Sequence, residues 1–186
     1  MPEFKSTYPL GTPLKEFVQT GDLIFTASTG IFGKVIRKVT DSMVNHVQIV
    51  LGKRIFDTDG EYGKAGYREL SAVTRKGMII MRSNFLVTPQ KEELTVLAEK
   101  YKGIRYDYWD VALNLILSPL SNPLRKRLIT FLGTKAMMKC DELVMRLLYE
   151  VSLKKELRWF EGNTPKSFLA ITLKNPLNFH LLYWNP

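Results

Sequence analysis

The stretch from Cys140 to Val151 places apolar side chains on one face of a helix. They recur at positions i, i+3, i+4, i+7, i+8 and i+11, the spacing of an amphipathic helix whose apolar stripe needs a partner surface. The residues of the stripe are Cys140, Leu143, Val144, Leu147, Leu148 and Val151. We therefore predict a buried helix that begins at about Cys140.

Cys140 is the only cysteine of the chain, so no intramolecular disulfide forms. In the first turn of the predicted helix its sulfur lies near unbonded N–H groups and the positive end of the helix dipole, which both favour a thiolate. Asp141 and Glu142 suit a helix start, but their charges oppose ionisation of the sulfur, so a base is needed. The alternative is that Cys140 is only a small buried apolar side chain.

His46 opens a predicted β-hairpin whose turn lies near Gly52. If residues 52–53 form the turn, His46 lies opposite Asp59, with Asp57 one diagonal step away. If residues 51–52 form it, His46 lies opposite Asp57. Either register puts both acids on the face of the histidine, because side chains alternate along a strand. A three-residue loop would break this relationship.

A carboxylate beside His46 fixes its tautomer and stabilises the imidazolium. An imidazolium near Cys140 would in turn stabilise the thiolate, at roughly 1 kcal/mol for each pKa unit. This is the nucleophile, base and orienter arrangement of cysteine hydrolases. The alternative is a strand-end histidine held by a local hydrogen bond. His180, the second histidine, lies in an apolar strand pattern and is expected to be structural. One Cys and two His make no zinc spacing, so we expect no metal or cofactor.

The 186 residues suggest one domain, 1–186, with a net charge of +9. That charge favours anionic surroundings such as nucleic acid, an acidic membrane surface or an anionic envelope polymer. The basic residues are spread along the chain and form no specific nucleic-acid motif, so a solvated cationic surface is the alternative. No signal peptide is evident, and the longest apolar run, Val111–Leu120, is too short to cross a bilayer, which predicts a cytoplasmic protein.

The order of the predicted elements is helices, a run of strands, then helices, which is typical of an α+β fold. Strands are expected at 23–25, 45–59 and 78–82, and helices after Thr88-Pro89, from Cys140 and after Thr164-Pro165. A terminal strand is expected at 179–184.

Five short motifs occur in a fixed order along the chain. They are Gly21-Asp22-Leu23-Ile24-Phe25, Asn45-His46-Val47, Ile55-Phe56-Asp57, Gly103-Ile104-Arg105-Tyr106-Asp107 and Cys140-Asp141-Glu142-Leu143-Val144. This ordered set resembles the YiiX-like branch of the NlpC-type, papain-fold cysteine hydrolases, over about residues 20–169. That branch is circularly permuted, as are the related lecithin:retinol acyltransferase-like enzymes, so the histidine strand precedes the cysteine helix.

The resemblance implies a small antiparallel sheet packed against the cysteine-bearing helix, and it implies roles for individual residues. Cys140 would be the nucleophile, His46 the base and Asp57 the orienting acid, where relatives often carry Glu. Tyr106 would line the site, or serve as a core aromatic. Substrate binding is assigned to Tyr106, Asp59 and Asn45, the last standing where relatives commonly carry Ser.

The resemblance leads us to expect a cysteine peptidase or amidase that works through an acyl-enzyme and acts on a peptide. One alternative is a lipid acyltransferase or thioesterase with the same dyad, which the apolar run Val111–Leu120 would favour. Another is a non-catalytic binding protein for an anionic polymer. Residues 109–138 would cover the site, hold an acyl chain, lie against a membrane or partner, or simply pack as a helix.

Overall fold

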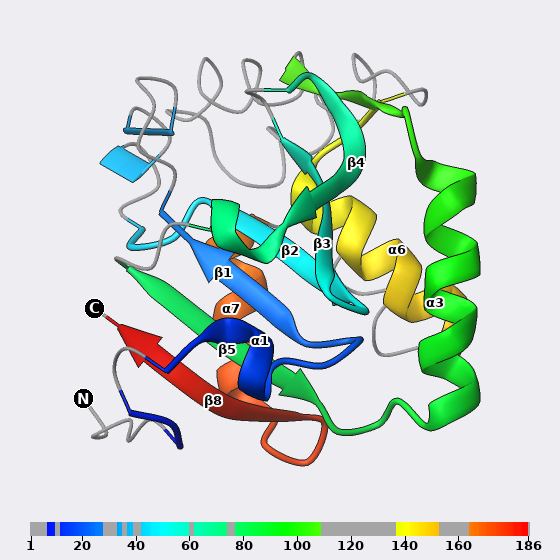
Figure 1. Cartoon of the computed structure of the whole chain (residues 1–186). Coiled ribbons are helices and arrows are strands. Elements are labelled where there is room, and N and C mark those ends of the chain that lie inside the picture. Colours follow the sequence, from blue (N-terminus) through cyan, green and yellow to red (C-terminus); the bar gives the residue numbers. More distant parts are fainter. Residues whose placement is uncertain are drawn as a thin grey trace.

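The computed structural model describes residues 7–9, 12–27, 33–34, 37–38, 42–59, 62–73, 77–108, 137–152 and 164–185. Most of the apolar and basic segment 109–138, including Val111–Leu120, lies outside these ranges, so the uses predicted for it stay predictions. The described part of the chain has an α+β architecture, as predicted (Figure 1).

An eight-stranded sheet organises the molecule, in the order β7-β6-β4-β3-β2-β1-β5-β8. Neighbouring strands are antiparallel except for β6 and β7, which run parallel. The strands are β1 Leu23–Thr26, β2 His46–Leu51, β3 Arg54–Asp59, β4 Lys64–Glu69, β5 Met78–Ser83, β6 Arg105–Tyr106, β7 Met137–Met138 and β8 Phe179–Asn185. The sheet is larger than the small one predicted, because β4, β6 and β7 extend it beyond the hairpin.

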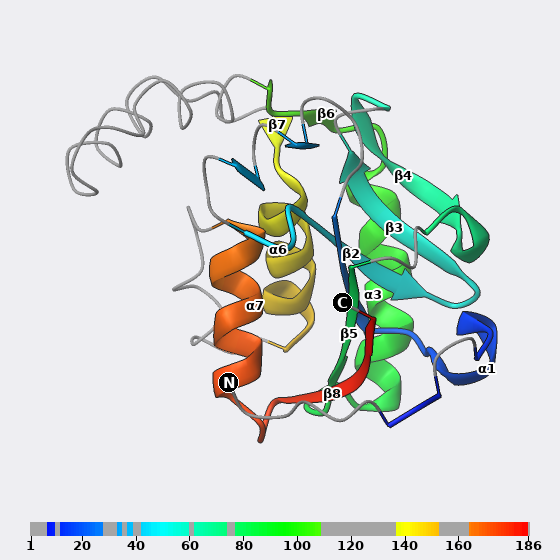
Figure 2. The same cartoon turned by 90° about the vertical axis from the view of Figure 1, so that its left-hand side faces the viewer.

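The helices lie on both faces of this sheet (Figure 2). On one face, α6 packs beside α7 and α3 and contacts β2 and β3, while α1 lies against the opposite face. Among the helices that the structure describes, none combines the length and the apolar character that a bilayer crossing requires. Their bounds are α1 Leu14–Phe17, the 3-10 helix η1 Leu70–Ala72, α3 Thr88–Tyr101, α6 Cys140–Ser152 and α7 Pro165–Lys174.

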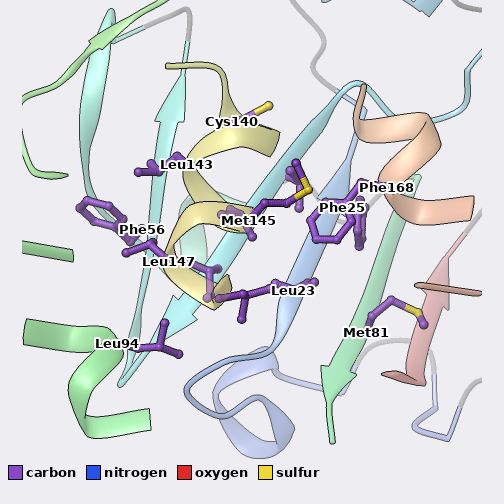
Figure 3. Packing of buried hydrophobic residues seen from close by; sticks show 14 of the residues in the cluster. Leu23, Phe25, Phe56, Met81, Leu94, Cys140, Leu143, Met145, Leu147 and Phe168 are labelled. Carbon is purple, nitrogen blue, oxygen red and sulfur yellow. The ribbon is translucent and has the colours of Figure 1, made fainter. Parts of the chain in front are cut away.

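Helix α6 begins at Cys140 and buries the predicted apolar stripe, so both predictions are confirmed. Leu143, Val144, Leu147 and Leu148 have no exposed surface and pack into the larger core cluster. Each buried leucine of this kind stabilises the fold by about 1.5–3 kcal/mol relative to an exposed one. In Figure 3, Cys140 lies at one end of this cluster, on the first turn of the helix.

The β2–β3 hairpin has the first of the two predicted registers. Ile49 pairs with Phe56 and Leu51 with Arg54, so Gly52 and Lys53 form the turn. Gly52 has a φ of 63°, in the left-handed region that a glycine adopts without strain. Continuing the register toward the start of β2 places Gln48 opposite Asp57 and His46 opposite Asp59.

Strand β4 is the main element that sequence reasoning missed. Its residues, Lys64-Ala65-Gly66-Tyr67-Arg68-Glu69, include no β-branched side chain and mix charged, small and aromatic residues, which obscures the strand pattern. The strand forms because it pairs along the whole of β3, from Asp59–Lys64 to Arg54–Glu69. It brings Arg68 beside the candidate site.

Candidate active site

His46 and Asp57 form a buried polar pair on the β2–β3 hairpin. Nε2 of His46 lies 3.0 Å from Oδ2 of Asp57, and both side chains are nearly inaccessible to solvent. The contact is diagonal, because the residue directly opposite Asp57 is Gln48. The Gln48 amide donates a second hydrogen bond to the same oxygen, at 2.9 Å. The predicted proximity of His46 and Asp57 is thus a feature of the structure.

His46 also shares a hydrogen bond with Cys140, so one imidazole links strand β2 to the start of helix α6. Burial has the largest single effect on the pKa of His46 and lowers it. The charge of Cys140, the hydrogen bonds with Asp57 and Cys140, and the charge of Asp57 together outweigh burial and hold this pKa well above its usual value. The arrangement favours the imidazolium form of His46.

The first turn of α6 sets the surroundings of the Cys140 sulfur. The first bond inside the helix runs from the N–H of Leu143 to the carbonyl of Lys139, so the amide of Cys140 precedes the bonded part of the helix. Glu142 accepts a hydrogen bond from the N–H of Lys139 at 3.3 Å, and its other oxygen lies 3.6 Å from Nζ of Lys139. The charge of Glu142 is therefore balanced by Lys139, which weakens its predicted opposition to a thiolate.

Two residues that contact Asp57 were not predicted as site residues from the sequence. Gln48 shares a strand face with His46, so strict alternation along β2 could have found it. Arg68, whose Nε lies 3.8 Å from Oδ1 of Asp57, comes from the unpredicted strand β4. No local pattern in the sequence could have placed Arg68 there.

The structure places the predicted substrate-binding residues in different settings. The side-chain amide of Asn45 donates to the carbonyl of Gly33 at 3.0 Å, a contact that ties the start of β2 to a neighbouring segment. Asp59 ends β3, where its backbone pairs with Lys64. Tyr106 is buried and makes an edge-on contact with Tyr108, their ring centroids 5.0 Å apart. Substrate binding by Asn45, Asp59 and Tyr106 stays a prediction.

The Gly21-Asp22 motif has a structural contact instead of a place in the site. The carboxylate of buried Asp22 accepts hydrogen bonds from Nε and Nη2 of Arg82 at 3.0 and 2.9 Å, and from the backbone N–H of Gln19 at 2.9 Å. These bonds fasten the entry to β1 onto β5. His180 is exposed on β8, and both β1 and β5 separate that strand from β2.

A groove of about 460 Å³ lies away from these residues, at the turn end of the β2–β3 hairpin. Its lining includes Gly52, Lys53, Tyr67, Thr88 and Lys91. His46 is at the other end of β2, so this groove does not contain the Cys140–His46 pair.

Within the part of the chain that the structure describes, no three His, Cys, Asp or Glu side chains are grouped to hold a metal ion.

Comparisons with known proteins support the fold. No protein-family model matches the sequence, and no curated protein matches it either. A crystal structure of YiiX from Escherichia coli O157:H7, which is described as a metalloprotein, is similar to this chain with a TM-score of 0.51 and 21% sequence identity. The likeness covers 80% of this chain and 85% of that one. At this identity it bears on architecture alone: the chain has a YiiX-like α+β fold.

Proposed function

We propose that this protein is a cysteine-dependent hydrolase, a peptidase or amidase, with Cys140 as nucleophile, His46 as base and Asp57 as orienter. One observation carries the proposal: a single buried imidazole is hydrogen-bonded to Asp57 on one side and to the sulfur at a helix start on the other. Burial of a charged pair is costly, and here each charge has a partner. A cysteine that served only as packing would not need these polar neighbours.

The arrangement also supports the permuted papain-like interpretation of the fold. In a papain-like enzyme, a helix that starts with the nucleophilic cysteine packs on an antiparallel sheet that carries the histidine and the orienting residue. Here α6 starts at Cys140, and β2 and β3 carry His46 and Asp57. The strands precede the helix in the chain, as a circular permutation requires.

The first half of the proposed reaction forms an acyl-enzyme. The Cys140 thiol gives its proton to Nδ1 of His46, and the thiolate sulfur attacks the carbonyl carbon of the substrate. A C–S bond forms while the carbonyl electron pair moves to oxygen, where backbone amides, including that of Cys140, stabilise the charge. The carbonyl then re-forms, the C–N bond breaks, and the leaving amine takes the proton from His46.

The second half returns the enzyme to its starting state. His46 accepts a proton from water, the hydroxide oxygen attacks the thioester carbon, and a C–O bond forms. When the tetrahedral species collapses, the carbonyl re-forms, the C–S bond breaks with its electron pair on sulfur, and the carboxylic acid is released. The proton on His46 and the thiolate of Cys140 then restore the starting pair. Asp57 keeps Nε2 of His46 engaged throughout, so that Nδ1 always faces the reacting atoms.

Hydrolysis of a panel of peptide and amide substrates tests the proposal. The wild-type protein should release amines from at least one class, and Cys140→Ala and His46→Ala should lose this activity while melting near the wild-type temperature. An exposed cationic residue on α3 provides a matched surface control, Lys100→Ala. Activity retained in Cys140→Ala would contradict the proposal.

Acyl transfer or thioester hydrolysis is a second candidate, and the surroundings of the pair favour it. Met43, Tyr62 and Tyr108 expose 54%, 55% and 43% of their surface. They flank the start of β2, the β3–β4 connection and the end of β6, all at the end of the sheet where His46 lies. Apolar groups of a substrate would gain from such neighbours. Acyl thioesters and esters of increasing chain length, added to the same panel, separate this candidate from a peptidase.

A further inference from the structure

The carboxylate of Asp57 is held from both sides by neighbouring strands. On the β2 side, Oδ2 of Asp57 lies 3.0 Å from the ring nitrogen Nε2 of His46 and 2.9 Å from the amide nitrogen Nε2 of Gln48. Across β4, its Oδ1 lies 3.8 Å from Nε of Arg68, which is an ion-pair distance but too long for a hydrogen bond. The two strands therefore attract opposite oxygens of one carboxylate.

Arg68 is well placed to draw Asp57 away from His46. Its guanidinium donates to the carbonyls of Tyr67 and Lys64 and lies 3.8 Å over the ring of Tyr62. Residue 66, which pairs with Asp57 across the strands, is a glycine, and a Cβ there would come within 3.3 Å of Nη1 of Arg68. Because Gly66 has no side chain, the guanidinium of Arg68 has room beside Oδ1 of Asp57.

Gln48 opposes that attraction on the other side. It lies directly across from Asp57, is only 8% exposed, and binds the same oxygen as His46. An amide donor stays neutral at every pH, so it holds Oδ2 toward β2 whether His46 is protonated or not. It does so without cancelling the charge of Asp57 that stabilises the imidazolium.

The other end of the Gln48 side chain indicates that this residue does not serve stability alone. Oε1 of Gln48 is buried and has no hydrogen-bond partner among the described residues. A buried acceptor without a partner lowers stability, and an apolar side chain of similar shape would avoid that cost. A glutamine at this position therefore lowers the stability of the fold, which suggests that its amide group has another use.

We infer that Gln48 is a positioning residue, which holds Asp57 against His46 and thereby keeps the imidazole directed at Cys140. This inference rests on the proposed function. Gln48 acts through Asp57, to which its side-chain amide donates a hydrogen bond.

Replacement of Gln48 by an apolar side chain of similar shape tests the inference. In Gln48→Met, and in Gln48→Leu as a second variant, alkylation of Cys140 by iodoacetamide at pH 6 should slow by about tenfold to 150-fold, the ratio that corresponds to one charge-assisted hydrogen bond. The pH at which His46 loses its proton, followed by its ring ¹⁵N shifts, should fall. The melting temperature should stay the same or rise, because the buried Oε1 is removed.

Thr58→Val is the matched control, since Thr58 adjoins Asp57 and its buried hydroxyl also has no partner among the described residues. This variant should leave alkylation and the His46 titration unchanged. If Gln48→Met and Gln48→Leu alkylate like the wild type, or lose stability together with reactivity, Gln48 is not a positioning residue. The proposed function fails separately, if wild type and His46→Ala alkylate at equal rates.

Discussion

Oδ2 of Asp57 lies 3.0 Å from Nε2 of His46, although the two residues stand diagonally on β2 and β3. The diagonal contact frees the position directly opposite Asp57 for Gln48, and it commits Nε2 of His46 to the acid. The remaining nitrogen, Nδ1, is then the one that the proposed mechanism assigns to Cys140.

Loss of the charge on Asp57 should reduce turnover without unfolding the protein. In Asp57→Asn the side chain keeps its shape but can favour the wrong tautomer of His46, so we expect kcat to fall by roughly 10²–10⁴-fold. Steady-state kinetics and circular dichroism together check this. Glu69→Gln, which removes one exposed carboxylate from β4, is the control and should behave as the wild type. An unchanged rate in Asp57→Asn would remove Asp57 from the mechanism.

The protonation of His46 should depend on Cys140. Because the charge of Cys140 is the largest effect that raises the pKa of His46, and burial opposes it, Cys140→Ala should lower that pKa. In the wild type, His46 should stay an imidazolium above its ordinary pKa of about 6.5. Ring ¹⁵N shifts recorded from about pH 5 to about pH 10 follow this titration in both proteins. Identical titrations would mean that sulfur and imidazole do not interact.

The same shift predicts how stability changes with pH. The pKa of His46 is raised by folding, so its contribution is fully present below the unfolded value of about 6.5 and is lost as the pH rises through the folded value. The free energies of unfolding of the wild type and of His46→Gln, measured in urea, should therefore differ most below about pH 6.5. The two proteins should converge at alkaline pH, and a difference that grows there would contradict the assignment.

The sequence predicted the parts of this site that depend on local periodicity. The 3.6-residue stripe after Cys140 placed the cysteine in the first turn of α6, and the two-residue alternation of the hairpin put Asp57 on the face of His46. The Arg68 contact could not be predicted, because it depends on β4, whose pairing with β3 outweighs weak strand propensity. The contact between His46 and Cys140 depends on how α6 packs on the sheet, and from the sequence only the family resemblance suggested it.

Removal of the Asp22 charge should destabilise the fold and leave the site chemistry intact. In Asp22→Asn the guanidinium of Arg82 loses its carboxylate partner, which we expect to cost roughly 2–4 kcal/mol of the free energy of unfolding. Arg82→Lys is the matched variant: it keeps the charge but loses the two-pronged contact, and should cost less. Urea denaturation measures both. If Asp22→Asn is as stable as the wild type, the Gly21-Asp22 motif has a role other than fastening β1 to β5.

The pH profile of Cys140 alkylation tests the central claim most directly, because the chain has no other thiol. If His46 and Cys140 form a thiolate–imidazolium pair, iodoacetamide should react with the wild type at acidic pH, well below the ordinary thiol pKa of about 8.5. In His46→Ala the rate should fall by at least about tenfold at pH 6 and recover only as the pH approaches that thiol value. Superimposable profiles for the two proteins would contradict the account.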